Sequence, residues 1–180
     1  ARALQHWRHA ENVQWQFLAI WHRPKGNADI EFVMPLTQVS KTALLLSSPE
    51  YAKANGLKPR ARIKALANMG DSPTLMLNAP VPAAKKVLQK AGLTVADIDL
   101  FEVNEAFSVV TEKFIRDLNI DRDRINVNGG AMALGHPIGA TGSILVGTML
   151  DELERQDKQF GLITMCAAGG MAPAVIIERV

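Results

Sequence analysis

A run without charge is the feature that most constrains the fold of this chain. Between Ile125 and Leu150 there is no Asp, Glu, Lys or Arg, and the run is broken by Asn126, Pro137 and repeated glycines. It is long enough to cross a bilayer, but these residues favour a buried helix entered by a loop. A chain that buries such a helix on most sides needs a substantial hydrophobic core around it.

Length and composition indicate an ordinary soluble globular protein. With 180 residues, 48% of them hydrophobic, the chain is long enough for one domain with its own core. A net charge of +2 is too small to imply a nucleic-acid or membrane-surface partner, and we predict neither. The densest basic cluster alternates with apolar residues and indicates the exposed face of a strand; it consists of Lys58, Arg60, Arg62 and Lys64.

The single cysteine, Cys166, excludes an internal disulfide and favours a reducing compartment. The first residues include His6, Arg8 and Glu11, where a signal peptide needs an uninterrupted apolar core. We therefore expect a cytoplasmic protein.

The composition changes near residue 38. All three tryptophans and three of the four histidines lie in the first 22 residues, whereas the rest has the Ala, Gly, Leu and Val texture of an α/β domain. We expect an N-terminal segment of uncertain origin over residues 1–38 and a domain over residues 39–180. Residues 3–20 could form a helix, although the apolar spacing is irregular. His6 and His9 lie one helical turn apart, but no further ligand cluster completes a site, so no metal is expected.

Strand and helix signals alternate from residue 39 onward. Strands are predicted over residues 42–46, 61–67, 98–103, 161–165 and 174–178, and helices over residues 49–55, 80–91, 105–118 and 139–153. The helix over 105–118 has the clearest apolar stripe, which includes Phe107, and Asn104 is its natural N-cap. Alternating elements that end in two paired strands predict a layered α/β domain.

Three side chains could carry chemistry. His136 lies between Gly135 and Pro137, so a substrate can approach its ring, and an uncharged environment lets the protein set its proton affinity. A purely structural histidine is an equally good interpretation. Cys166 would ordinarily be a small core side chain, but Ala168 and Gly169 behind it leave room for a ligand and expose backbone N–H groups. Asn104 is either a helix cap or a working residue at the end of a strand.

Other site types do not match the sequence. The glycines of the charge-free run lack both the dinucleotide-binding spacing and the lysine of a nucleoside-triphosphate loop. No serine stands in a Gly-x-Ser-x-Gly turn, which argues against a serine hydrolase.

Taken together, three blocks resemble the thiolase family. They are Asn104 to Phe107, Asn128 to Gly142 with the stretch Leu134-Gly135-His136-Pro137, and Cys166 in a glycine-rich tail. The similarity covers residues 39–180 and corresponds to the C-terminal half of a thiolase. It implies an α/β fold of βαβαβαββ topology around a mixed five-stranded sheet.

The resemblance also implies a reaction, in which acyl groups pass between coenzyme A thioesters by Claisen condensation or thiolysis. His136 would activate a nucleophilic cysteine and help to hold the thioester oxygen, Asn104 would position a water in the same oxyanion hole, and Cys166 would move the proton at the substrate α-carbon. Phe107 would line the acyl chain or pack in the core, and Ala168 and Gly169 would bind substrate through their backbone. Coenzyme A thioesters would be the substrates, with no separate cofactor and no metal.

Three departures from the family pattern bear on this prediction. No cysteine precedes Cys166, so the acyl-accepting nucleophile is absent from this chain. Residues 36–41 replace the stretch with which family members help to bind coenzyme A. Ala168 stands where the family commonly has glycine, although its backbone N–H is kept if its φ and ψ are allowed.

Several hypotheses remain open at this point. In the first, a complementary thiolase N-terminal half completes the site, and the apolar face between the halves also favours a homo-oligomer. In the second, the domain is a non-catalytic remnant that serves as an oligomerising or interaction domain. In the third, Cys166 is itself the nucleophile of an acyl-CoA enzyme.

Overall fold

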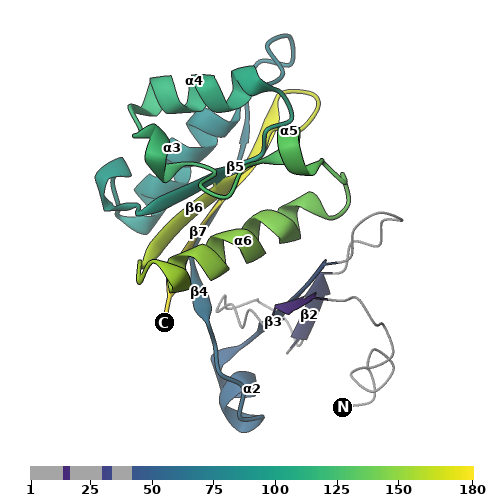
Figure 1. Ribbon diagram of the computed structural model, residues 1–180, viewed down its shortest axis with the longest axis vertical. Helices are drawn as coiled ribbons and strands as arrows, with labels where there is room; N and C mark the ends of the chain where they lie inside the picture. Colours follow the sequence, from purple (N-terminus) through teal and green to yellow (C-terminus); the bar gives the residue numbers. More distant parts are fainter. Residues whose placement is uncertain (1–13, 17–29, 34–41) are drawn as a thin grey trace.

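The computed structural model describes residues 14–16, 30–33 and 42–180. Its main sheet has four strands in the order β4 (Ala61–Gly70), β7 (Met171–Arg179), β6 (Phe160–Thr164) and β5 (Leu100–Val103). Strands β5 and β6 are parallel, and β7 runs antiparallel to both of its neighbours (Figure 1). The sheet is therefore mixed, as the resemblance implied.

Helices cover both faces of this sheet. Helices α3 (Pro80–Ala91) and α4 (Ser108–Leu118) lie on one face, and α6 (Thr141–Arg155) lies on the other (Figure 1). The remaining short elements are η1 (Val95–Asp97), η2 (Arg122–Arg124) and α5 (Ala131–Leu134). The predicted layered α/β architecture is confirmed.

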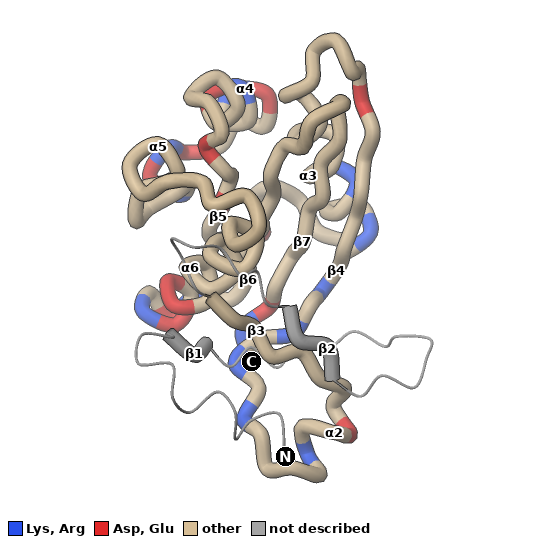
Figure 2. The backbone as a smooth tube through the Cα atoms, turned by 90° about the vertical axis from the view of Figure 1, so that its right-hand side faces the viewer, with Lys and Arg blue, Asp and Glu red and all other residues tan. Residues whose placement is uncertain are grey.

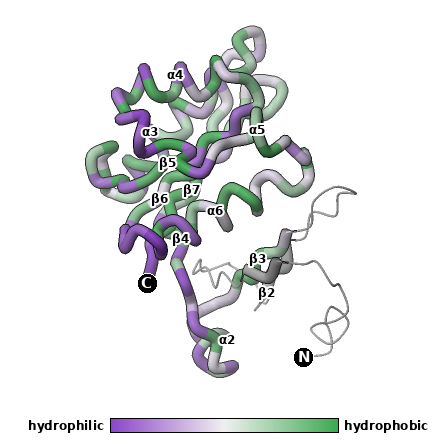
Figure 3. The backbone as a smooth tube through the Cα atoms, viewed as in Figure 1, coloured by the Kyte–Doolittle hydropathy of each residue, from purple (hydrophilic) through white to green (hydrophobic). Residues whose placement is uncertain are grey.

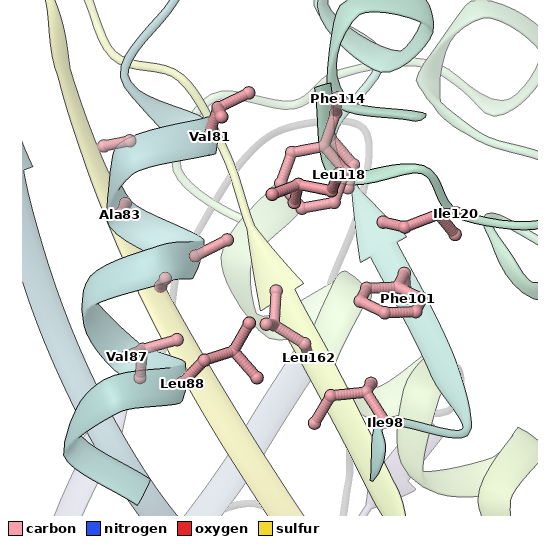
Figure 4. Packing of buried hydrophobic residues seen from close by; sticks show 14 of the residues in the cluster. Val81, Ala83, Val87, Leu88, Ile98, Phe101, Phe114, Leu118, Ile120 and Leu162 are labelled. Atoms are coloured by element: carbon pink, nitrogen blue, oxygen red, sulfur yellow. The ribbon is translucent and has the colours of Figure 1, made fainter. Parts of the chain in front are cut away.

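Two hydrophobic clusters hold the layers together. On the α3 and α4 side, the rings of Phe101 and Phe114 meet edge to face with their centroids 6.3 Å apart, and Leu162 lies between Phe101 and Val87 of α3 in the same cluster (Figure 4). On the α6 side the cluster joins the helix to the sheet and consists of Leu44, Ala61, Leu100, Leu145, Met149, Leu150, Leu153, Ile163 and Ile177. The charge-free residues of α6 are almost all buried or partly buried, as predicted, whereas residues 132–136 before the helix are exposed.

A second, smaller sheet holds the first predicted strand. It has the order β1 (Gln14–Gln16), β3 (Thr42–Ser47) and β2 (Ile30–Val33), with β1 parallel and β2 antiparallel to β3. Helix α2 (Pro49–Ala54) follows, and the Ser48 side chain caps it by accepting the N–H of Tyr51.

Two expectations need correction here. The main sheet has four strands in the described part of the chain instead of five, and a single parallel bridge between Phe101 and Ile125 occupies the position beyond β5. Within the helix predicted over residues 3–20, residues 14–16 form a strand because they pair with β3. The other residues of that helix, with His6 and His9, lie outside the described ranges.

Most of the other predicted elements are confirmed to within a few residues. Helix α3 begins at Pro80 and ends before Gly92, whose φ of 69° gives the expected left-handed C-cap. Helix α4 is the exception, because it begins at Ser108 and not at Glu105. Asn104 is therefore not its N-cap, and the prediction of that role was wrong.

The basic cluster at the start of β4 forms ion pairs within the fold. Arg62 makes two 2.8 Å hydrogen bonds to Glu178, its partner across the β4–β7 ladder, and Lys64 reaches the same carboxylate at 3.3 Å. Arg60 binds Asp151 and Glu154 near the end of α6, where charges gather in Figure 2. None of the helices in the described part of the chain is both long and apolar enough to cross a membrane.

We predict that Phe114→Ala lowers the free energy of unfolding by about 3–5 kcal/mol, because it removes a fully buried ring and leaves a cavity against Phe101. Val109→Ala on the same helix is the matched control, since Val109 is exposed, and it should change stability by less than about 0.5 kcal/mol. Urea unfolding followed by circular dichroism measures both. Equal effects would contradict the assignment of the core.

Candidate active site

The predicted site residues gather where β5 and β6 end. Asn104 follows β5 directly, and its backbone N–H donates to the carbonyl of Thr164, the last residue of β6, at 3.0 Å. Cys166 lies two residues beyond Thr164. Because the two strands are parallel, Asn104 and Cys166 lie at the same edge of the sheet, where α/β folds place functional groups.

The charge-free run joins this edge through Asn126. The run pairs with β5 at Ile125 and then turns away at Asn126, which has a φ of 48°. The Asn126 side chain then makes the hydrogen bonds to β5 that a strand backbone would otherwise make. Its Oδ1 accepts the N–H of Val103 at 2.8 Å, and its Nδ2 donates to the Val103 carbonyl at 2.9 Å. The backbone groups at the end of β5 are therefore satisfied without a fifth strand.

His136 lies between two polar side chains. Its Nδ1 is 2.7 Å from Thr141 Oγ1, and its Nε2 is 3.5 Å from Asn104 Nδ2. The Thr141 hydroxyl donates its one proton to the Pro137 carbonyl at 3.0 Å, so it must accept from the ring. This arrangement assigns the proton to Nδ1 and leaves the Nε2 lone pair facing the Asn104 amide, as a general base requires.

Asn104 has no role in capping a helix. It is completely buried, and its Oδ1 has no hydrogen-bond partner among the described residues. Residues 105–107 are not helical, and Phe107, the residue before α4, has extended backbone angles of −149° and 149°. A fully buried amide whose oxygen has no partner is uncommon in folded proteins.

Cys166 is buried beside this edge, with 8% of its surface exposed, as part of the core cluster on the α3 and α4 side. Burial raises the pKa of its thiol, and a backbone hydrogen bond opposes that shift in part. Among the described residues, no hydrogen bond joins Cys166 to His136 or Asn104. The ordinary core role and a role in proton transfer both remain compatible with this position.

A tight turn follows Cys166. Ala167 and Met171 exchange two backbone hydrogen bonds of 2.7 and 3.3 Å, and the exposed residues Ala168 and Gly169 form part of the turn between them. Gly169 has a φ of 83°, whereas Ala168 is not among the residues with positive φ. Alanine therefore fits this position without strain, and its backbone N–H is retained.

The segment around His136 is open to solvent. His136 is exposed, and apolar side chains stand out beside it on α5 and the following loop, namely Met132, Leu134 and Ile138. Figure 3 shows that this part of the chain is largely neutral or hydrophobic. Phe107 is 58% exposed, so the expectation that it packs in the core was wrong. A cavity of about 470 Å³ lies elsewhere, between α2 and the C-terminal Val180.

The site edge also contains a buried carboxyl group, Glu102. Only 3% of its surface is exposed, and burial together with the nearby charges of Glu105 and Glu152 raises its pKa to about 8. In the described residues no group of three or more His, Cys, Asp or Glu could hold a metal ion.

The sequence analysis missed the residues that orient the site. Thr141, which fixes the proton on His136, received no role although it lies within the motif. Glu105 and Asn126 also received none, although Asn126 binds the backbone at the end of β5 and Glu105 joins Asn126 to the Met132 N–H in α5. The available signal was a run of amide and carboxylate side chains next to glycines, which suggests side chains that bind backbone groups.

Comparison with known proteins identifies the family. Residues 57–179 match the family model of the thiolase C-terminal domain. The chain belongs to the thiolase family. This confirms the resemblance seen in the sequence motifs.

Thiolases from several bacteria are similar to this chain. A 3-ketoacyl-CoA thiolase of Serratia proteamaculans is 52% identical over 143 residues, which are 77% of this chain and 37% of that protein. A steroid 3-ketoacyl-CoA thiolase of Mycobacterium tuberculosis is 48% identical over 138 residues, which are 77% of this chain and 34% of that protein. The crystal structure of a Bacillus anthracis acetyl-CoA acetyltransferase matches with a TM-score of 0.75 and 39% identity, over 77% of this chain and 35% of that one. The chain thus spans little more than a third of the length of these thiolases.

The raised pKa of Glu102 predicts a pH-dependent gain in stability for Glu102→Gln. The carboxyl group ionises near 4.5 when unfolded but near 8 when folded, so the wild type loses stability between these values as the pH rises. The variant avoids this loss and should be more stable by a few kcal/mol at pH 8, on the order given by a shift of this size. The difference should vanish below pH 4. Urea unfolding from pH 4 to pH 8.5 measures it, and a difference independent of pH would contradict the assignment.

Proposed function

We propose that this chain is the C-terminal half of a thiolase-type acyltransferase and supplies the base and the oxyanion donors for chemistry on coenzyme A thioesters. The observation that carries the proposal is the His136 ring, protonated on Nδ1 by its bond to Thr141 and presenting Nε2 beside the buried Asn104 amide. The relatives named as 3-ketoacyl-CoA thiolases support the choice of reaction.

In thiolysis, each of these groups has a definite task. A cysteine from a complementary N-terminal half gives its proton to His136 Nε2, and its thiolate attacks the 3-keto carbon of the substrate. The bond between C2 and C3 then breaks, and the enolate of the departing acyl-CoA takes a proton from Cys166 at C2. The acyl group then passes to the sulfur of coenzyme A, whose proton restores the Cys166 thiol, and the released cysteine thiolate takes its proton back from His136 Nε2. In this scheme the Asn104 amide, directly or through a water, and the protonated Nε2 stabilise the oxyanion.

The environment of Cys166 suits this assignment. A thiol whose pKa is raised by burial stays protonated near neutral pH, so it can act as an acid toward an enolate. The same property makes it a poor nucleophile, which argues against the hypothesis that Cys166 accepts the acyl group. Acyl labelling of Cys166 would be required for that alternative.

The proposal includes partners and context. The partners are acyl-CoA and coenzyme A, with either a complementary N-terminal half or further copies of this chain covering the open face, and the reducing environment suited to a free thiol is the cytoplasm. Residues 39–180 would form the thiolase unit, and residues 1–38 would be a separate segment. Phe107, Ala168 and Gly169 would contact the substrate.

The exposed apolar residues favour one alternative. Met132, Leu134 and Ile138 are exposed apolar side chains that another protein could cover, and no cysteine precedes Cys166. A folded, non-catalytic interaction domain would have the same properties. The two functions differ in whether His136 matters for a reaction once a cysteine is supplied.

The deciding experiment mixes this chain with a separately purified N-terminal half of a related thiolase and measures acetoacetyl-CoA thiolysis. We expect activity in the mixture and none from either part alone, because the nucleophile and its base lie on different chains. His136→Ala should abolish the activity, and a nucleophile-free N-terminal half is the matched control. Binding without activity would favour the interaction domain, and activity of this chain alone would contradict the missing nucleophile.

Thr141→Val tests how the ring is held. Valine has nearly the same shape but leaves the Nδ1–H of His136 without its acceptor, whereas the Pro137 carbonyl still accepts the backbone N–H groups of Ala140 and Thr141. We expect kcat in the mixture to fall by about 10- to 100-fold, equivalent to about 1–3 kcal/mol.

Thr141→Ser, which keeps the hydroxyl, is the matched control and should retain most of the activity. If valine and serine behave alike, the hydroxyl does not orient the ring.

A further inference from the structure

Glu105 joins the two segments that carry the site. Its Oε1 accepts the Asn126 Nδ2 at 2.9 Å, and its Oε2 accepts the backbone N–H of Met132 in α5 at 3.2 Å. We propose that Glu105 is a positioning residue: by fixing the glycine-rich segment before His136, it keeps the ring where Thr141 can hold its Nδ1 proton. Its effect on catalysis rests on the function proposed above.

The first bond ties Glu105 to the end of β5. The same Asn126 Nδ2 that donates to Glu105 also donates to the Val103 carbonyl. One amide group therefore holds the carboxylate and the strand in a fixed relation. A carboxylate with two N–H donors of fixed direction has little freedom to rotate.

The second bond reaches the short helix α5. The N–H groups of Leu134 and Gly135 donate to the carbonyls of Gly130 and Ala131 at 2.9 and 2.8 Å, so residues 130–135 form one tight turn. Gly135, with a φ of 94°, leads directly into His136. If Gly130 or Met132 moves, the turn moves with it and the His136 ring, which follows directly, is displaced as well.

Gly130 provides an independent sign that the carboxylate has a fixed place. A Cβ added to Gly130 would overlap the Glu105 carboxyl group, and its three nearest neighbours would all be atoms of that group. The backbone angles of Gly130 are −134° and −166°, which are extended and allowed for any residue. The backbone thus allows any residue at this position, but a side chain there would have to displace the Glu105 carboxylate from its two donors.

Glu105→Gln is the first test variant, because glutamine has the same shape but only one acceptor. Its NH₂ group must face either the Asn126 amide or the Met132 N–H, and both are donors. The readout is the pair of ¹⁵N frequencies of the His136 ring in the full chain, which report its tautomer. We expect the Nδ1–H form in the wild type and a loss of that form in the variant.

Glu112→Gln is the matched control, since Glu112 is an exposed residue of α4 that pairs with Arg122. It should leave the ring frequencies unchanged. Unchanged frequencies in Glu105→Gln as well would overturn the proposal.

A double-mutant cycle makes the test independent of how well one variant folds. Gly130→Ala should displace the carboxylate and disturb the ring as Glu105→Gln does. In a Glu105→Ala background the obstacle is gone, so adding Gly130→Ala should change thiolysis by no more than about twofold. Equal effects of Gly130→Ala in both backgrounds would show that the carboxylate is not what glycine accommodates, and the proposal would fail.

Kinetics with the N-terminal half separate this inference from the proposed function. A misplaced imidazole should lower kcat by up to about 10²-fold and leave KM nearly unchanged. If the wild-type mixture is inactive while the ring frequencies still depend on Glu105, the proposed function fails and the positioning role stands. If the mixture is active but Glu105→Gln changes neither kcat nor the ring frequencies, the positioning role fails and the function stands.

Discussion

The candidate site depends on the Asn126 side chain, which continues the sheet where the backbone cannot. Asn126 turns away from β5 with a positive φ, yet its amide satisfies both backbone groups of Val103. The pairing ends after one bridge at Ile125, and the Asn126 side chain supplies the partners of the Val103 N–H and carbonyl in place of a further strand residue.

Two glutamates close to each other in the sequence, Glu102 and Glu105, have different environments at this end of the sheet. Glu105 accepts two N–H groups and fixes the loop, whereas Glu102, one strand position from Val103, is buried with a pKa of about 8. Both would face strong repulsion if they were charged and buried together. Because Glu102 takes up a proton at neutral pH, the fold tolerates a carboxyl group beside Glu105 and Glu152. Above pH 4.5 the unfolded chain releases this proton and the folded chain keeps it, so the buried Glu102 lowers the free energy of unfolding.

Local patterns in the sequence predicted most elements, because caps, prolines and apolar periodicity act within a few residues. They failed where a distant partner decides the structure. The helix expected from Glu105 begins three residues later, since Glu105 and Asn104 bind Asn126 and His136, more than twenty residues away. The pairing of β3 with β1 and β2, apart from the main sheet, was equally invisible. The motifs pointed to Asn104 and His136, which the structure brings together, but they could not show that Thr141 fixes the ring.

An open site limits what these groups can do alone. His136 is exposed and Ile138 beside it is 86% exposed, so water competes for every hydrogen bond that the imidazole could give to a substrate oxygen. Donors aimed at a developing charge are worth much more in a site from which water is excluded. Covering Met132, Leu134 and Ile138 with another apolar surface would therefore do two things at once: bury hydrophobic area, which favours association, and lower the dielectric around Nε2. Under the proposed function, assembly and catalysis would then depend on the same few side chains.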